Sequence, residues 1–272
     1  MTRRPFFGHA GGLDRPECAP EHRTGAGEQD PPSTETMFWL LIAAGFGLLS
    51  LAHVAPFPFL LDAVASAPAV WSIPDGDGPP AVYLTFDDGP NPTATPLLLD
   101  VLAEQGAHAT FFVIDRHLTE RTAPIVRRMF EEGHAVGLHT HTRHWMVLPP
   151  DEVARRLHAA AARIERLAGR APCRAFRPHA GFRSGRMYEG LARAGYSLVG
   201  WGWSLWDFNW YRRPDPSGLA DRLAARISGG DIVVMHDGHH ENPDADRQYA
   251  VDATALLIPK LRARGFVFGT IC

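Results

Sequence analysis

The chain has 272 residues, 45% of them hydrophobic and 21% charged, which is enough for one sizeable globular domain with short additions. The net charge of −3 at pH 7 excludes the strongly basic surface of most nucleic-acid-binding proteins, so no nucleic-acid partner is expected. The three cysteines, Cys18, Cys173 and Cys272, are too few and too scattered to predict a disulfide framework or a zinc cluster.

Residues 1–79 contain three segments of different composition. Residues 1–36 are polar, rich in Gly and Pro and without hydrophobic periodicity, which predicts a disordered tail. Residues 37–61 form an apolar run without a charged side chain, which predicts a transmembrane or signal-anchor helix. Residues 62–79 are rich in Ala, Pro, Gly and Asp, which predicts a linker that keeps the following domain close to the bilayer.

The arginines predict the orientation of this membrane segment. The tail holds four arginines, whereas no Arg or Lys lies between Met37 and Arg116, so the N-terminus is expected in the cytoplasm. The domain after the linker is then extracytoplasmic and membrane-anchored. A signal peptide cleaved at Ala65-Ser66-Ala67 is the alternative and would give a secreted protein. Met37 is an alternative to Met1 as the true start.

Residues 80–272 alternate between strand-like and helix-like runs, which predicts a parallel sheet covered by helices. The strand-like runs are residues 81–86, 109–114, 135–138, 174–176, 196–200, 232–236 and 266–271. The helix-like runs are residues 94–105, 123–132, 151–168, 185–194, 218–227 and 251–264. This alternation is typical of an irregular (β/α)7 barrel, in which chemistry takes place at the carboxyl ends of the strands.

Five of the predicted strands end in polar or aromatic residues that are expected to meet at this rim. They are Asp87 and Asp88, then His139, then Arg177 and His179, then Trp201–Trp210, and finally His236 and Asp237. Adjacent strand residues point to opposite sides, so Asp87 and Asp88 need not share one role, and a metal ligand beside a general base is one division. A turn that uses Asp as a cap is the alternative for this pair in isolation.

The histidines and Arg177 have specific expected roles. Two of His139, His141 and His144, together with Asp88, would give a zinc-like divalent cation three ligands and leave positions for water and substrate. A solvated histidine-rich loop is the alternative. Arg177 would keep a neighbouring carboxylate ionised, because the two opposite charges stabilise each other.

Three further groups could act on a substrate. A backbone N–H near Ala180 would face a developing oxyanion, and His236 would protonate a leaving amine unless it is a structural histidine. The aromatic stretch is expected to contact sugar rings through Trp203, Asp207 and Trp210. A core cluster and a contact with the membrane interface are alternatives for this stretch.

These residues resemble the polysaccharide deacetylase family, the NodB-like carbohydrate esterases, over residues 80–272. The five segments similar to the family's motifs are Thr85–Pro90, Gly133–Thr140, Arg177–Gly181, Trp203–Trp210 and Ile232–Asp237. The resemblance implies that Asp87 is the catalytic base, that Asp88 and His139 bind the metal, and that Arg177 orients the base. It also implies an oxyanion hole at the third motif and His236 as the general acid.

The chain departs from the family's pattern at three positions. Arg143 stands where the second motif has its other histidine, so His144, one residue later, is the expected third metal ligand after a shift of the loop. The alternatives are that His141 or His179 completes the site, or that the metal is weak or absent. Asn209 stands where the fourth motif has an aspartate, which leaves Asp207 to tune the general acid. His179 replaces a smaller or aromatic residue of the third motif.

The sequence therefore predicts a metal-dependent hydrolase that removes N-acetyl or other N-acyl groups from amino sugars of a cell-envelope polysaccharide or glycolipid. An N-acetylated glycan is the expected substrate, and a lipid-linked sugar is the narrower alternative suggested by the short linker. A catalytically degenerate, glycan-binding domain on the same barrel is the alternative in another class.

Overall fold

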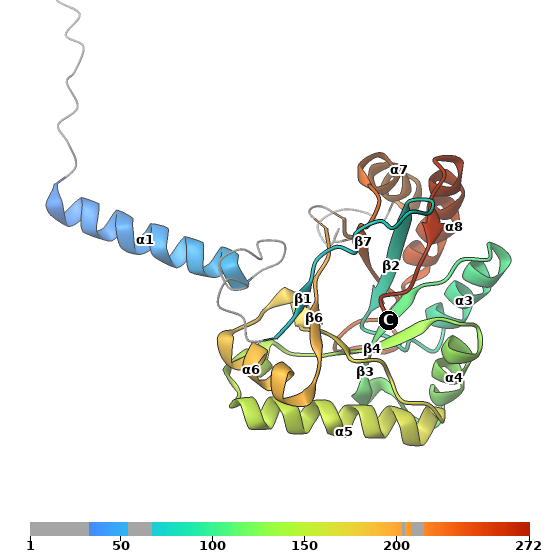
Figure 1. The fold of residues 1–272 in the computed structure, drawn as a ribbon, viewed down its shortest axis with the longest axis horizontal. Helices are drawn as coiled ribbons and strands as arrows, with labels where there is room; N and C mark the ends of the chain where they lie inside the picture. Colours follow the sequence, from blue (N-terminus) through green and yellow to red (C-terminus); the bar gives the residue numbers. More distant parts are fainter. Residues whose placement is uncertain (1–32, 54–66, 203–204, 208–214) are drawn as a thin grey trace, which may run out of the picture. The chain divides into compact units, whose positions relative to one another are not determined.

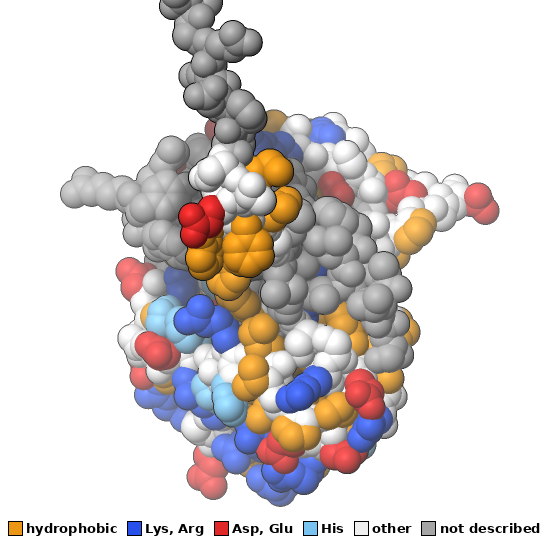
Figure 2. Space-filling model, turned by 90° about the vertical axis from the view of Figure 1, so that its left-hand side faces the viewer, with side chains coloured by type: hydrophobic (Ala, Val, Ile, Leu, Met, Phe, Trp, Pro, Cys, Tyr) orange, Lys and Arg blue, Asp and Glu red, His pale blue; other side chains and the backbone are white. Residues whose placement is uncertain are grey.

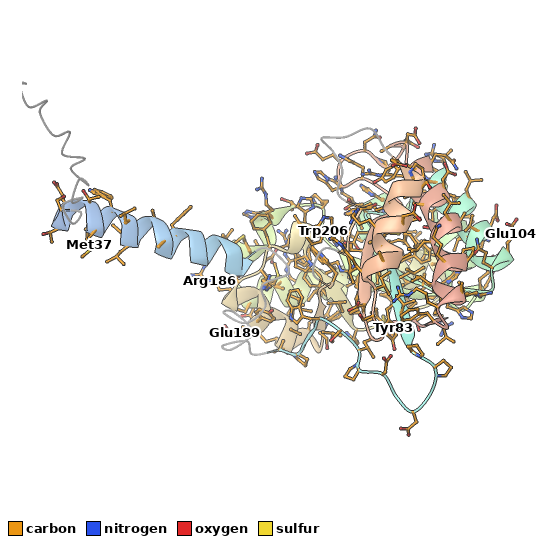
Figure 3. The ribbon with its side chains drawn as sticks, turned by 90° about the horizontal axis from the view of Figure 1, so that it is seen from above. Met37, Tyr83, Glu104, Arg186, Glu189 and Trp206 are labelled. Carbon is orange, nitrogen blue, oxygen red and sulfur yellow. A yellow bond between two sulfur atoms is a disulfide. The ribbon has the colours of Figure 1, made fainter. Side chains whose placement is uncertain are left out.

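The computed structural model describes residues 33–53, 67–202, 205–207 and 215–272. Residues 1–43 and 44–272 form two separate units. The helix α1 (Thr34–His53) begins inside the predicted tail, because the Ser33 hydroxyl caps it by accepting a hydrogen bond of 3.2 Å from the N–H of Thr36. Large hydrophobic side chains of this helix are exposed, including Met37 at 50% (Figures 2 and 3).

The predicted membrane segment is not supported by the structure. Among the described residues, no helix has both the length and the apolar character that crossing a bilayer requires. α1 ends at His53, and the remainder of the predicted span, together with Ala65 and Ser66 of the predicted cleavage site, lies outside the described residues.

The second unit is built on a sheet of parallel strands, as predicted (Figure 1). Its order is β1-β6-β5-β4-β3-β2-β7, and β8 pairs with β2. The strands are β1 (Ala69–Val70), β2 (Ala81–Asp87), β3 (Thr110–Ile114), β4 (Ala135–His139), β5 (Ala175–Arg177), β6 (Ser197–Val199), β7 (Ile232–His236) and β8 (Val267–Phe268). Predicted strand 266–271 shortens to the two residues of β8.

The sheet curls but is not a fully closed barrel. In the described part of the chain, no ladder joins β1 to β7, and isolated bridges join Ser72 to Asp231 and Trp206 to Val234 on this side. The segment after β6 adds two backbone bonds to Val234, one donated by Asp207 and one accepted by Leu205. The predicted (β/α)7 barrel is therefore correct in its parallel strands and curvature, whereas its closure rests on these local contacts.

Helices cover the outer face of the sheet, at the positions that hydrophobic periodicity predicts. They are α3 (Ala94–Glu104), α4 (Ala123–Glu131), α5 (Pro150–Ala168), α6 (Gly185–Ala194), α7 (Pro216–Arg226) and α8 (Gln248–Ala263). In α5, the buried side chains include Val153, Leu157 and Ile164, which share one face. Gly169 ends this helix in the left-handed conformation at φ 82°.

Alternation along the strands separates two cores. The larger core joins one face of the sheet to the helices and includes Phe86, Phe111 and Phe176. The smaller core consists of side chains on the other face together with a tryptophan, namely Phe112, Ala175, Val199, Trp201, Ile232 and Val234. Site residues whose side chains point to this second face therefore lie above the packed side chains of the smaller core.

Two features outside the site were not predicted from the sequence. β1 lies within residues 62–79, which were predicted as a linker, and it pairs with β6 through Ala69–Leu198 and Val70–Val199. Cys173 and Cys272 form a disulfide across a separation of 99 residues. Cys18 lies outside the described residues.

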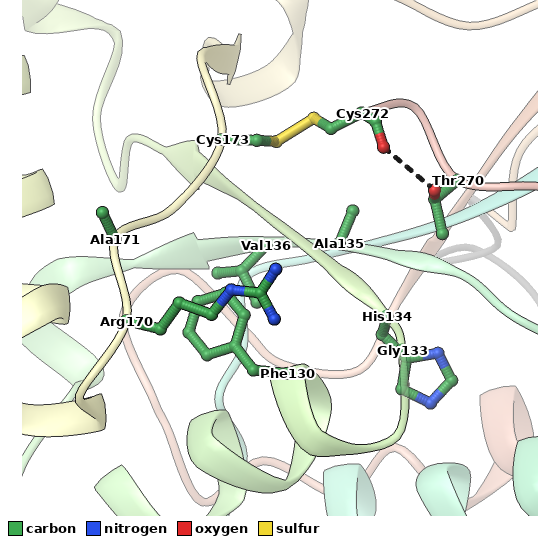
Figure 4. A pocket seen from close by; sticks show the side chains of 10 residues that line it. All are labelled: Phe130, Gly133, His134, Ala135, Val136, Arg170, Ala171, Cys173, Thr270 and Cys272. Atoms are coloured by element: carbon green, nitrogen blue, oxygen red, sulfur yellow. Dashed lines mark hydrogen bonds between the residues drawn. A yellow bond between two sulfur atoms is a disulfide. The ribbon is translucent and has the colours of Figure 1, made fainter.

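The disulfide borders a pocket of about 220 Å³ at the amino ends of β4 and β5 (Figure 4). Arg170 also lines it, with its guanidinium 5.4 Å from the centre of the Phe130 ring. The predicted site residues belong to the opposite ends of the strands, so this pocket is separate from the candidate active site.

Candidate active site

The strand register brings four predicted site residues to one rim of the sheet. Asp87 of β2 is the partner of His236 of β7, and His139 of β4 is the partner of Arg177 of β5. Each is the last residue of its strand. β3 separates the two pairs and contributes Phe112 as the partner of Asp87. The rim predicted at the carboxyl ends of the strands is therefore present.

Arg177 fixes the position of the Asp87 carboxylate. Its Nη1 donates hydrogen bonds of 2.7 Å to Oδ1 of Asp87 and to Oγ1 of Thr85. Its other nitrogens donate to the carbonyl oxygens of Val199 at 3.2 Å and Gly200 at 2.9 Å. Burial lowers the pKa of Arg177, and the charge of Asp87 opposes this shift. The fully buried guanidinium thus has its opposite charge beside it, and Asp87 is held in one orientation.

Asp88, His139 and His179 form a cluster with the composition of a cation site. One ligand atom of each lies within 4.8 Å of the others. A carboxylate and two imidazoles are typical ligands of a zinc-like divalent ion. Burial lowers the pKa of His179 to about 4, with the charges of His139 and His240 acting in the same direction, so its ring is neutral at pH 7. Neutral imidazole is the form that binds metals.

His139 is oriented so that one ring nitrogen faces Asp88. Its Nδ1 lies 2.7 Å from the carbonyl oxygen of Arg177 and must donate a proton to it. Its Nε2 then lies 3.3 Å from Oδ1 of Asp88, a buried oxygen that has no hydrogen-bond partner among the described residues. A carboxylate oxygen and an imidazole lone pair that face each other fit a shared cation.

Asp207 holds His236 in one tautomer. Oδ1 of Asp207 lies 2.6 Å from Nδ1 of His236, and Oδ2 accepts a bond of 2.9 Å from the His236 backbone N–H. The hydroxyl of Tyr249 also donates to Oδ2, at 3.1 Å. Burial alone lowers the pKa of His236, but the charge of Asp207 and the hydrogen bond to it outweigh burial and raise the pKa to about 9. His236 is thus protonated at pH 7 and can act as an acid.

The other predicted residues are placed less uniformly. His144 is exposed on the short helix η2 (Arg143–Val147) and is not in the cluster, so the structure does not bring it to Asp88. Ala180 is exposed in η3 (His179–Gly181), beside the cluster. Asp207 lies beneath His236 rather than at an open surface. Trp203 and Trp210 lie outside the described residues.

Sequence reasoning missed several supporting residues. Thr85 contacts Arg177, and Tyr249 contacts Asp207. Thr85 begins the first motif but had no assigned role, and Tyr249 lies outside the motifs. Thr140 accepts a bond of 2.9 Å from the N–H of His179 and so joins the loops after β4 and β5. Trp201, expected as a sugar contact or a core residue, is buried in the smaller core.

Comparisons with known sequences agree with this geometry. The family model described as polysaccharide deacetylase matches residues 75–199. A chitooligosaccharide deacetylase of Sinorhizobium fredii is 37% identical over 208 residues, which cover 72% of this chain and 92% of the relative. A peptidoglycan-N-acetylglucosamine deacetylase of Bacillus cereus is 30% identical over 201 residues, which cover 74% and 90%.

Solved structures give the same result for the fold. The crystal structure of a peptidoglycan N-acetylglucosamine deacetylase matches with a TM-score of 0.65 at 28% identity, covering 75% of this chain and 91% of that one. A family 4 acetyl xylan esterase from Clostridium thermocellum, solved with a cobalt ion, matches with a TM-score of 0.61 at 29% identity and coverages of 70% and 88%.

Proposed function

Because the chain belongs to the polysaccharide deacetylase family, we propose that it hydrolyses N-acetyl groups from amino sugars of a cell-envelope polysaccharide or glycolipid. The observation that carries the proposal is the pairing of Asp87 with His236 beside the Asp88–His139 cluster. A base and an acid on neighbouring strands can act on opposite sides of one acetamide group.

The side chains at the rim have separate roles in the proposed amide hydrolysis. Asp87, held in place by Arg177 at 2.7 Å, accepts the proton of the attacking water. His236 donates its Nε2 proton to the leaving amine, since Nδ1 is occupied by Asp207. A divalent cation bound by Asp88 and His139 would polarise the acetyl carbonyl and make bound water more acidic.

The loop after β5 is the proposed source of the oxyanion donor. Ala180 has φ 51° and ψ 22°, and Gly181 has φ 72°. The N–H groups of Gly181 and Phe182 bond to the carbonyls of Pro178 and His179. Because the N–H groups of Gly181 and Phe182 are used in these bonds, the backbone N–H of Ala180 is the proposed donor. It would stabilise the negative oxygen that forms when water adds to the carbonyl.

The disulfide supports an extracytoplasmic location for this domain. Disulfides such as Cys173–Cys272 form and persist in oxidising compartments and are rare in the cytosol. An oxidising compartment agrees with a substrate in the cell envelope.

Acetate release tests the proposed activity. The full chain is incubated with zinc and with chitooligosaccharides, peptidoglycan fragments or a lipid-linked N-acetylated sugar, and acetate is measured. Asp87→Asn should abolish release, whereas the exposed variant Asp221→Asn should retain it. Release by Asp87→Asn at the parental rate would refute Asp87 as the base. No release by the parent from any substrate would favour the glycan-binding alternative.

A further inference from the structure

The second-motif position of this chain cannot supply a metal ligand. Arg143 occupies it, and a guanidinium stays charged and offers only donors. The Arg143 guanidinium lies 5.3 Å from the centre of the Phe182 ring, in a cation–π contact. The next residue, His144, is exposed, and its N–H bonds back to Oγ1 of Thr142 at 3.3 Å. Neither side chain belongs to the cluster of Asp88 and His139.

We propose that His179, from the loop after β5, takes the place of the missing histidine and completes a three-ligand site for a zinc-like divalent cation with Asp88 and His139. This inference rests on the proposed metal-dependent function and specifies its site. It moves the third ligand from the loop after β4 to the loop after β5, which lies next to it in the sheet.

The backbone holds His179 at the cluster. The His179 N–H donates a bond of 2.9 Å to Oγ1 of Thr140, the residue that follows His139, so the two ligand-bearing loops are joined. The centres of the His139 and His179 rings are 6.4 Å apart. This separation leaves room for an ion between nitrogen atoms, since a zinc–nitrogen bond is about 2.0 Å long.

Backbone strain marks the same place. Among the described residues, Asp88 at φ 71° and Ala180 at φ 51° are the non-glycine residues with positive φ. One is a proposed ligand, and the other directly follows the proposed ligand His179. Such conformations cost free energy and persist where the surrounding structure imposes them, most often at functional sites. One strained residue within the cluster and one directly beside it indicate that the surrounding structure imposes the geometry of the cluster.

The cluster also contains an atom that a cation would satisfy. Oδ1 of Asp88 is buried without a hydrogen bond from the described residues, and Nε2 of His139 faces it as an acceptor. A buried acceptor without a partner is costly, and two facing acceptors repel each other. A positive ion between them and His179 removes both costs.

A structural role for His179 is the rival explanation. Its ring lies 4.5 Å from the ring of His240, so His179 could serve only to pack the loop after β7 against the rim. The two roles differ in what removal of the imidazole does to metal binding. A packing role predicts a change in stability and no change in the number of bound imidazoles.

Metal titration and X-ray absorption on the full chain test the proposal. Zinc binding to parent, His179→Gln, His179→Ala and His144→Ala proteins is measured by calorimetry without substrate. The zinc absorption edge of each loaded protein is then used to count imidazole ligands. Both His179 variants should lose affinity by more than about 100-fold, since even groups that only orient a ligand contribute up to this factor. His144→Ala should bind as the parent does.

The imidazole count gives the decisive result. The parent and His144→Ala proteins should show two imidazoles, and His179→Gln should show one. Two imidazoles in His179→Gln, or loss of binding in His144→Ala alone, would overturn the proposal. Circular dichroism of the metal-free proteins checks folding, and the glutamine variant serves if the alanine variant does not fold. Because no substrate is present, tight zinc binding through His179 without acetate release would refute the activity and leave the site intact.

Discussion

Asp207 and His236 are joined twice, by 2.6 Å between Oδ1 and the ring Nδ1 and by 2.9 Å between Oδ2 and the backbone N–H. The double contact fixes the orientation of the His236 ring, because Nδ1 and the backbone N–H are both held by one carboxylate. Asp207 is almost fully buried, so its charge acts on His236 with little screening.

Asp207→Asn should shift the pH dependence of activity. The raised pKa of about 9 keeps His236 protonated at neutral pH, and an amide at position 207 removes the charge that raises it. The alkaline limb of kcat/KM should therefore move from near pH 9 towards or below pH 6.5, and activity at pH 8 should fall. A profile measured from pH 5 to 10 checks this, and an unmoved alkaline limb would contradict the assignment.

The same pair contributes to folding stability in a pH-dependent way. A group whose pKa is higher in the folded than in the unfolded state stabilises the fold fully below its unfolded value. For His236 this contribution is complete below about pH 6.5 and is lost as the pH rises through about 9. Urea unfolding at pH 6 and pH 9.5 should show a larger loss of stability for the parent than for Asp207→Asn.

Arg177→Met should destabilise the protein and abolish activity. The variant leaves the Asp87 carboxylate buried without its cation, and breaking a buried ion pair costs about 3–5 kcal/mol. Arg193→Met is the matched control, because Arg193 makes its ion pairs on the surface and its loss should change stability little. Urea unfolding measures both, and equal effects would show that the buried pair has no special role.

Removal of divalent metal should abolish acetate release reversibly. Dialysis against a chelator would leave Asp87 and His236 in place but remove the polarising ion, and added zinc should restore the rate. The melting temperature should also fall on removal, because a ligand that binds only the folded state stabilises it. Full activity in excess chelator would contradict a metal-dependent reaction.

Reduction of the Cys173–Cys272 disulfide should lower stability without altering the rim. The bond closes a loop of about 100 residues, for which chain entropy gives roughly 5 kcal/mol. Cys272→Ser should therefore melt at a lower temperature, while Cys18→Ser serves as the control. Activity well below the melting temperature should stay near the parental value, and an immediate loss of activity at 25 °C would show that the disulfide also supports the site.

The periodic parts of the fold could be predicted from the sequence. The six α-helices that the structure describes after residue 80 were expected within a few residues of their observed bounds, because each presents an apolar stripe at helical spacing. The parallel sheet and its polar rim followed from the alternation of strands and helices. β1 was missed because two residues without flanking periodicity pair with a strand far along the chain.

The part of the site that could be predicted from the sequence consists of residues at the ends of strands. Asp87, His139, Arg177 and His236 meet because parallel strands end at one rim. His144 was chosen over His179 by closeness in sequence to the motif, whereas the ligand cluster is decided by which loops are neighbours in the sheet. The disulfide joins residues 99 positions apart, a pairing that cysteine spacing alone does not show.

The pairing of Asp87 with His236 in the register of β2 and β7 limits how the substrate specificity of this enzyme can change. Neighbouring strands are held about 4.8 Å apart by backbone hydrogen bonds, so the spacing between the two strand ends that carry the proposed base and the proposed acid is fixed. Sugars of different size can be admitted only by altering the loops above that gap. Selection for a new glycan substrate would thus change the loops around the scissile amide and leave Asp87 and His236 unchanged.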